Sequence, residues 1–180
     1  MGLRISLVVF LLTLTLFGII GIKQWTLHHG KPITLQVDNS DLIPLFTGEV
    51  VRIRYNINAI PLDKLAEEDV ELNTHEIVYV VLKKGITYWE PEKVYLKKPN
   101  IEPDEIVLKG EITNRNFDSD MLYLKYGIEN YSISANESKK LEKPGTEDKI
   151  GVQVVVDRFG NAAIRAVLVN DQERYVEKLF

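Results

Sequence analysis

One serine and two lysines have the residue types that a hydrolase needs for a nucleophile and its base. Ser40 precedes a short loop, and Lys83 and Lys84 end the apolar run 77–82, which is typical of a strand. A lysine whose pKa is lowered by burial accepts the proton of a serine hydroxyl, which makes that oxygen nucleophilic. These three residues define one hypothesis, a Ser/Lys hydrolase.

The surroundings of Ser40 make this hypothesis the alternative rather than the preferred one. An apolar N-terminal segment followed by a serine, a proline and a Gly-acid pair resembles the entry to the signal peptidase fold, but Asp41 stands where that fold has methionine. A carboxylate there raises the pKa of a nearby lysine instead of lowering it. The two lysines also adjoin Gly85, which indicates an exposed turn. Ser40 is therefore better explained as a turn residue that bonds its own backbone.

A second set of residues has the types that a binding surface uses. Gly48-Glu49 is a turn signal, and the residues after it alternate apolar and polar side chains with the period of a half-buried strand. Aromatic strand faces and free strand edges hold peptides or other proteins. Cationic side chains on the polar face could line an anion site. The candidate binding residues are Gly48, Glu49, Arg52, Arg54, Tyr55 and Tyr126.

Three segments carry a family resemblance. The run 48–55, GEVVRIRY, resembles the signature of the GDYXXLXY-domain family, with Glu for Asp at Glu49, Val for Tyr at Val50 and Ile for Leu at Ile53. The run 78–82 followed by 88–91, and the segment 124–131 (LKYGIENY), are similar to further parts of that family. The resemblance implies a bacterial membrane-anchored protein with a β-rich body, and it implies no particular activity.

Composition excludes several classes of function. The chain has 180 residues, 45% of them hydrophobic, which suits one domain or two small ones. Its net charge is −4, with both signs interspersed and no Lys/Arg block, so we expect no nucleic-acid partner. It has no cysteine, which excludes disulfides and thiol chemistry. No His/Asp/Glu set has metal-ligand spacing and no nucleotide loop is present, so we expect neither metal nor cofactor.

The N-terminus predicts a membrane anchor, residues 1–25. Residues 5–22 are free of charge and lie between Arg4 and Lys23. As a helix rising about 1.5 Å per residue, such a segment spans nearly the hydrocarbon core. The competing interpretation is a cleaved signal peptide, but bulky isoleucines occupy the positions where a cleavage site needs small residues. Short N-terminal tails usually stay inside the cell, so we expect the body outside the cytoplasm.

The rest of the chain predicts a mainly β fold with antiparallel sheets and one or two short helices. The Pro-containing run 98–104 reads as a linker between two β-rich halves, residues 31–97 and 105–180. The second half resembles the first: residues 122–129 align with 51–58, and each half reads as strand, short helix (62–68 and 136–142), strand, turn, strand. A repeat predicts either two similar lobes or one sheet system with pseudo-twofold symmetry.

These patterns favour a non-enzymatic function. We expect a single-pass membrane protein whose β body serves as a binding or accessory module for a membrane or envelope protein. The alternative is the Ser/Lys hydrolase at the membrane surface.

Overall fold

The computed structural model describes residues 6–7, 9–11, 13–15, 30–38, 50–67, 72–116, 120–132, 149–170 and 172–176. Every paired strand in these ranges runs antiparallel to its neighbours, and the bridge between Leu65 and Val94 is parallel. The mainly β, antiparallel fold is therefore confirmed. The strands are β1 (Lys31–Gln36), β2 (Val50–Arg52), β3 (Ala59–Pro61), β4 (Ile77–Lys84), β5 (Trp89–Tyr95), β6 (Glu105–Asn116), β7 (Met121–Lys125), β8 (Asn130–Ser132), β9 (Ile150–Val156), β10 (Ala162–Val169) and β11 (Gln172–Val176).

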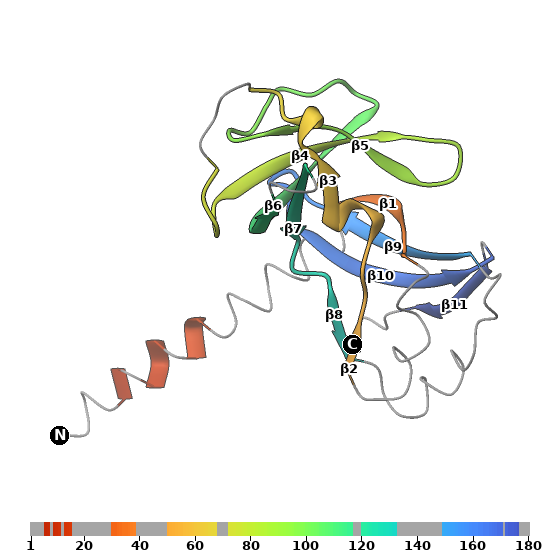
Figure 1. The fold of residues 1–180 in the computed structure, drawn as a ribbon. Helices are drawn as coiled ribbons and strands as arrows, with labels where there is room; N and C mark the ends of the chain where they lie inside the picture. The colour runs from red at the N-terminus through yellow and green to blue at the C-terminus, as the bar shows by residue number, and fades with distance from the viewer. Residues whose placement is uncertain are drawn as a thin grey trace.

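The strands form two large sheets and one small one. A four-stranded sheet has the order β1-β9-β10-β11, a five-stranded sheet has the order β3-β7-β6-β4-β5, and β2 pairs with β8. Figure 1 shows the β4–β5 hairpin above β9 and β10, with β2 and β8 extending below β7. Both large sheets contain strands from before and after the predicted linker, so neither half of the chain builds a sheet alone.

One hydrophobic core lies between the two large sheets. Strand β1 has one buried face, because Ile33, Leu35 and the following Val37 are buried while their neighbours are not. In β4, β6 and β9 alternate residues enter one cluster, while Val81, Val107 and Val155 on the opposite faces are buried as well. Burial of this shared core is what holds the halves of the chain together. The contributions of those three strands are Val78, Val80, Leu82, Ile106, Leu108, Ile112, Ile150, Val152, Val154 and Val156.

The short helices differ from the sequence prediction. The segment predicted as a helix at 62–68 forms only a 3-10 turn, η3 (Leu62–Lys64), because the chain becomes extended at Leu65 and bridges β5. The predicted strand after Gly48 ends at Arg52, and a second 3-10 turn, η2 (Asn56–Asn58), follows Tyr55. The other predicted helix, at 136–142, lies outside the described residues.

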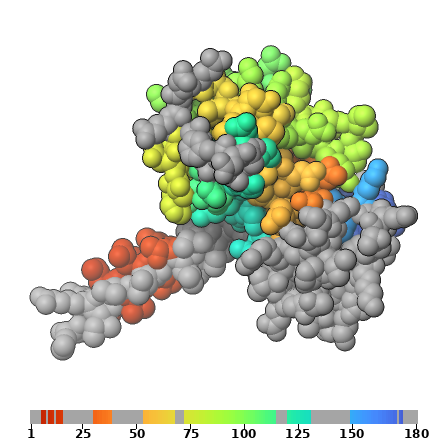
Figure 2. Space-filling view, in the orientation of Figure 1, coloured from red at the N-terminus to blue at the C-terminus, as the bar shows by residue number. Residues whose placement is uncertain are grey.

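The N-terminal segment is described at residues 6–7, 9–11 and 13–15, all of them helical. In this described part, no helix has the length and apolar character needed to cross a membrane. Figure 2 shows these residues standing clear of the β body. Their apolar side chains are largely exposed: Leu7 70%, Val9 56%, Phe10 67%, Leu11 60% and Leu14 58%.

Candidate functional site

The two tyrosines predicted as binding residues form a reciprocal pair in the core. Tyr55 and Tyr126 are 1% and 8% exposed. The Tyr55 hydroxyl donates to the carbonyl oxygen of Ile128 at 2.9 Å, and the Tyr126 hydroxyl donates to that of Ile57 at 2.7 Å. Each tyrosine thus bonds the residue that lies two positions after the other, which ties the segment after β2 to the segment after β7.

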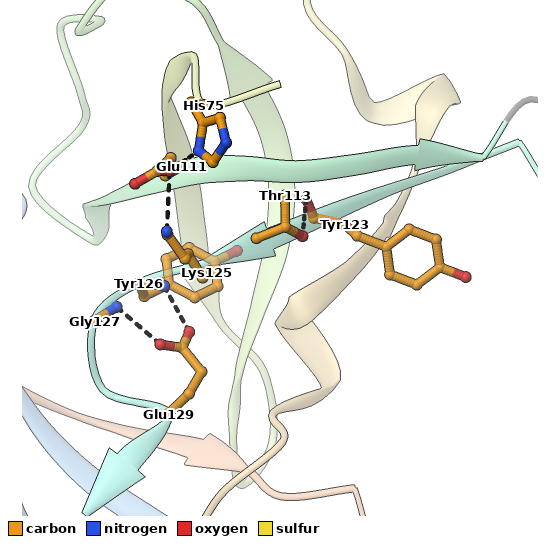
Figure 3. Close-up of polar contacts among 8 residues, drawn as sticks. All are labelled: His75, Glu111, Thr113, Tyr123, Lys125, Tyr126, Gly127 and Glu129. Carbon is orange, nitrogen blue, oxygen red and sulfur yellow. Dashed lines mark hydrogen bonds and ion pairs between the residues drawn. The ribbon is translucent and has the colours of Figure 1, made fainter. Parts of the chain in front are cut away.

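Asn58 and Glu129 complete this pair from the corresponding positions. Asn58 Oδ1 accepts the Tyr55 N–H at 2.6 Å, and Glu129 Oε1 accepts the Tyr126 N–H at 2.6 Å. Glu129 Oε2 also accepts the N–H of Gly127 at 2.9 Å, where a φ of 79° suits glycine (Figure 3). The two side chains meet directly, because Asn58 Nδ2 donates to Glu129 Oε1 at 3.0 Å.

This environment keeps both hydroxyls protonated. Burial raises the pKa of Tyr55 well above its ordinary value, and the nearby Glu129 carboxylate raises it further. The same two causes, in the same order, raise the pKa of Tyr126. A neutral, buried and hydrogen-bonded tyrosine stabilises a fold and offers no surface to a ligand. The sequence signal for this role is the shared pattern Tyr-x-Ile followed by a side-chain acceptor.

The other predicted binding residues do not join this pair. Gly48 and Glu49 lie outside the described residues. Arg52 is the last residue of β2. Arg54 is exposed, and its carbonyl oxygen accepts the N–H of Asp38 at 2.9 Å. The arrangement therefore separates Arg54, at the surface, from the tyrosines in the core.

The candidate hydrolase residues are only partly described. Lys83 and Lys84 end β4 and are exposed, and Lys83 Nζ lies 3.9 Å from the Glu92 carboxylate. The mechanism requires a buried lysine, and neither position provides one. Ser40 lies outside the described residues, so its pairing with a lysine stays a prediction.

A polar cluster that the sequence did not reveal is centred on Glu111. Its Oε1 lies 2.6 Å from His75 Nδ1 and 3.0 Å from Lys125 Nζ (Figure 3). His75 adopts a φ of 69°, while β6 and β7 pair Glu111 directly with Lys125. At the register shift just beyond, the Thr113 hydroxyl donates to the carbonyl oxygen of Tyr123. The cluster joins three distant segments, which is why no local pattern predicted it.

This geometry predicts a measurable change in the pKa of Glu111. The hydrogen bond from His75 is the main cause that lowers this pKa, and the bond from Lys125 adds to it. We expect His75→Asn, which tolerates the positive φ, to move the pKa of Glu111 upward toward its ordinary value. Carboxyl chemical shifts followed through an NMR pH titration measure this. An unchanged pKa would contradict the assigned bond.

The sign of the linked pH effect follows from the lowered pKa. A carboxylate with a lower pKa in the folded state stabilises that state above its ordinary pKa, about 4.3. That stabilisation is lost as the pH falls through the pKa of the folded state. The His75→Asn variant should lose less stability than the wild-type chain on acidification.

Two open cavities flank the turn between β9 and β10. Gly160, with a φ of 88°, approaches β6 so closely that a Cβ there would lie 3.0 Å from the backbone nitrogen of Lys109. Its carbonyl oxygen accepts the Lys109 N–H at 2.8 Å. A cavity of about 370 Å³ lies on the side of Glu111, Tyr126 and Gly127. A larger one, about 750 Å³, lies on the side of residues 105–107.

Among the residues that the structure describes, no group of three or more His, Asp or Glu side chains could hold a metal ion. Hydrogen bonds and ion pairs hold the polar clusters described above.

Comparison with known proteins places the chain in a family. A family model described as GDYXXLXY protein matches residues 12–167, most of the chain. No curated protein and no solved structure matches it. The matched range contains Tyr55, Tyr126, Glu111 and the residues around both cavities.

Proposed function

The chain belongs to the GDYXXLXY family, and we propose that it is a single-pass membrane-anchored module that binds a membrane or envelope protein. Its β body would lie outside the cytoplasm. The observation that carries this proposal is that Tyr55 and Tyr126 lie in the core, where their hydroxyls donate to backbone oxygens. The family-like segments thus build the body, and its open features are the two cavities beside the turn between β9 and β10, which suit binding.

The N-terminal segment supports the tether. Residues 5–22 carry no charge, and the described apolar side chains among them are more than half exposed. Such side chains are stabilised when they leave water for lipid. A tether confines the body to the membrane surface and raises the effective concentration of partners there.

Extraction of membranes at alkaline pH tests the tether. We expect the full chain to stay in the membrane pellet, and a Leu11→Arg/Leu14→Arg variant to appear in the supernatant. An arginine at a helix centre costs about 2.5–3.5 kcal/mol on insertion scales, so two of them should prevent insertion. A Leu11→Ile/Leu14→Ile variant is the matched control and should stay in the pellet. Extraction of the unaltered chain in soluble form would refute the tether.

Protease added to intact spheroplasts tests the side of the membrane. We expect the β body to be digested without lysis, while a cytoplasmic marker survives. Digestion only after lysis would place the body in the cytoplasm.

Crosslinking in native membranes tests the binding role. The full chain should capture a defined membrane or envelope protein, and a Gly48→Ala/Glu49→Ala variant should capture less of it. Equal capture by the two chains would show that Gly48 and Glu49 are not part of the binding surface. The absence of any specific crosslinked protein would refute a stable partner.

A further inference from the structure

The loop between β4 and β5 presents an isoleucine to solvent. The Gly85 N–H donates to the carbonyl oxygen of Tyr88 at 2.9 Å, which closes a tight turn around Ile86 and Thr87. Ile86 is 103% exposed, the highest value among the large apolar side chains in the described part of the chain. Turns usually carry glycine, proline, asparagine, aspartate or serine. Neither core packing nor turn chemistry therefore explains an isoleucine at this tip.

The rest of the hairpin fixes the tip in place. Tyr88 packs over β9, because a Cβ added at Gly151 would lie 3.1 Å from the tyrosine ring. Trp89 pairs with Lys84 and packs against the hydrophobic core. Figure 1 shows the loop projecting from the body at the end of this hairpin. Ile86 is thus held where it can meet an external surface.

The proposed tether enters the body beside this hairpin. Lys31 is the first residue of β1, and its Nζ lies 5.7 Å from the centre of the Trp89 ring. The charge-free run of the N-terminus ends just before Lys23, eight residues before Lys31. Eight residues span at most about 29 Å when fully extended. With the tether inserted, Lys31 and the base of the hairpin therefore stay close to the membrane.

The same connection lets the tip reach the bilayer. In Figure 1 the tip and the helical N-terminal residues lie on different sides of the body, so docking of the tip lays the body against the membrane. Ile86 is only three residues beyond Trp89, about 10 Å of strand, which is well within the reach of the connection. Because the tether already holds the body at the surface, even a small apolar contact with lipid can form.

Charge does not choose what covers the tip. Lys83 and Lys84 adjoin the turn on β4, but Glu90 and Glu92 lie on the partner strand, and Lys83 Nζ is 3.9 Å from the Glu92 carboxylate. An apolar side chain is stabilised when it leaves water, whatever the charge of the surface that it enters. The bilayer is the apolar medium that the tether brings within reach of Ile86.

We propose that the β4–β5 tip docks on the lipid bilayer, with Ile86 inserted at the boundary between headgroups and acyl chains. The N-terminal segment and the tip are then two separate points of attachment, and together they fix which side of the body faces the membrane. The proposal rests on the proposed tether and needs no protein partner.

Quenching of a label at the tip by modified lipid tests the docking. The chain has no cysteine, so Ile86→Cys in the full chain accepts a single environment-sensitive fluorophore. In proteoliposomes of zwitterionic lipid, a lipid that carries a nitroxide near its headgroup should lower the fluorescence about twofold, because interfacial side chains enter that layer. We expect the same result in anionic lipid. No quenching in either lipid would overturn the proposal.

Phe159→Cys is the matched control. Phe159 is also an apolar residue in a turn between two strands, 55% exposed. Its neighbour Gly160 bonds Lys109 in β6. The tip hairpin pairs with β6 four residues away, where Glu105 lies opposite Lys83. A label at Phe159→Cys should keep its fluorescence, and equal quenching of both labels would show that lipid contact is not specific to the tip.

A label at Thr87→Cys measures the contribution of Ile86 itself. With this label in place, Ile86→Asp should abolish the quenching and Ile86→Leu should keep it. Because Ile86 is fully exposed, neither change should alter thermal unfolding, which is measured first. If quenching falls as more protein is added per vesicle, a second copy of the chain covers the tip and docking on lipid is wrong.

Alkaline extraction of the same proteoliposomes separates this proposal from the tether. If the chain stays in the membrane and the tip label is not quenched, the docking is wrong and the tether stands. If the chain is extracted in soluble form, both are wrong.

Discussion

Tyr55→Phe and Tyr126→Phe should each lower the free energy of unfolding by about 1–3 kcal/mol, because each leaves a buried carbonyl oxygen without its donor. The acceptors are the backbone oxygens of Ile128 and Ile57, both in the hydrophobic core. Phenylalanine keeps the packing of the ring, so the loss reports the hydrogen bond. Chemical denaturation of the two variants and of their double variant measures it.

A matched variant separates this effect from the general loss of a hydroxyl. Tyr79→Phe changes a half-buried tyrosine on β4 and should shift stability by less than about 0.5 kcal/mol. If Tyr55→Phe costs no more than Tyr79→Phe, the reciprocal pair does not hold the two segments together.

Alkaline pH gives the pair a second signature. The pKa of both tyrosines is raised in the folded state by burial. Their contribution is complete below the ordinary tyrosine pKa, about 10, and falls as the pH rises above it, because only the unfolded chain then releases these protons. The double phenylalanine variant should therefore lose less stability between pH 9 and 11 than the wild-type chain does.

The alternating pattern of β1 shows what the sequence could predict. A period of two fixes which face of a strand is apolar, so the burial of Ile33, Leu35 and Val37 followed from residue types alone. The pattern carries no information about which strand lies next to which. The contacts of Glu111 with His75 and Lys125 depend on that pairing, and they were missed for this reason.

Tyr55 and Tyr126 show a different limit of prediction from sequence. Their types suited either a binding surface or a core, and only the positions of Ile57 and Ile128 decide for the core. Where the sequence predicted a continuous strand through Tyr55, the backbone instead turns at η2 so that Asn58 meets the Tyr55 N–H. This local hydrogen bond, made to a side chain three residues later, outweighed strand propensity.

The internal repeat stays a prediction, and strand pairing supports it. When the alignment of 51–58 with 122–129 is extended at both ends, Val50 corresponds to Met121 and Ser132 corresponds to Pro61. The paired residues Val50 and Ser132 of β2 and β8 therefore correspond to Met121 and Pro61, which pair in β7 and β3. The other two pairs of β2 and β8 convert in the same way. We propose that the two halves are related by a pseudo-twofold axis that passes between Tyr55 and Tyr126.

Glu129→Ala should lower the free energy of unfolding by about 2–4 kcal/mol. Its carboxylate accepts three donors, the N–H groups of Tyr126 and Gly127 and the amide of Asn58. Bonds to a charged acceptor contribute about 1.5–3 kcal/mol each, reduced here because the side chain is half-exposed and water replaces part of them. The free energy of unfolding of Glu129→Gln should lie between those of the wild-type chain and Glu129→Ala, since the NH₂ group of glutamine faces one of the three donors and cannot accept its hydrogen bond.

Glu105→Ala is the matched control for the loss of this carboxylate. Glu105 is also half-exposed, but its carboxylate accepts a backbone N–H from Glu102 at one end of β6 and ties no distant segments together. It should therefore cost about 1 kcal/mol or less. Hydrogen exchange adds a local readout, because the amides of Tyr126 and Gly127 should exchange faster in Glu129→Ala and at the wild-type rate in Glu105→Ala. Equal destabilisation by the two alanine variants would show that Glu129 does not order the turn that carries Tyr126 into the core.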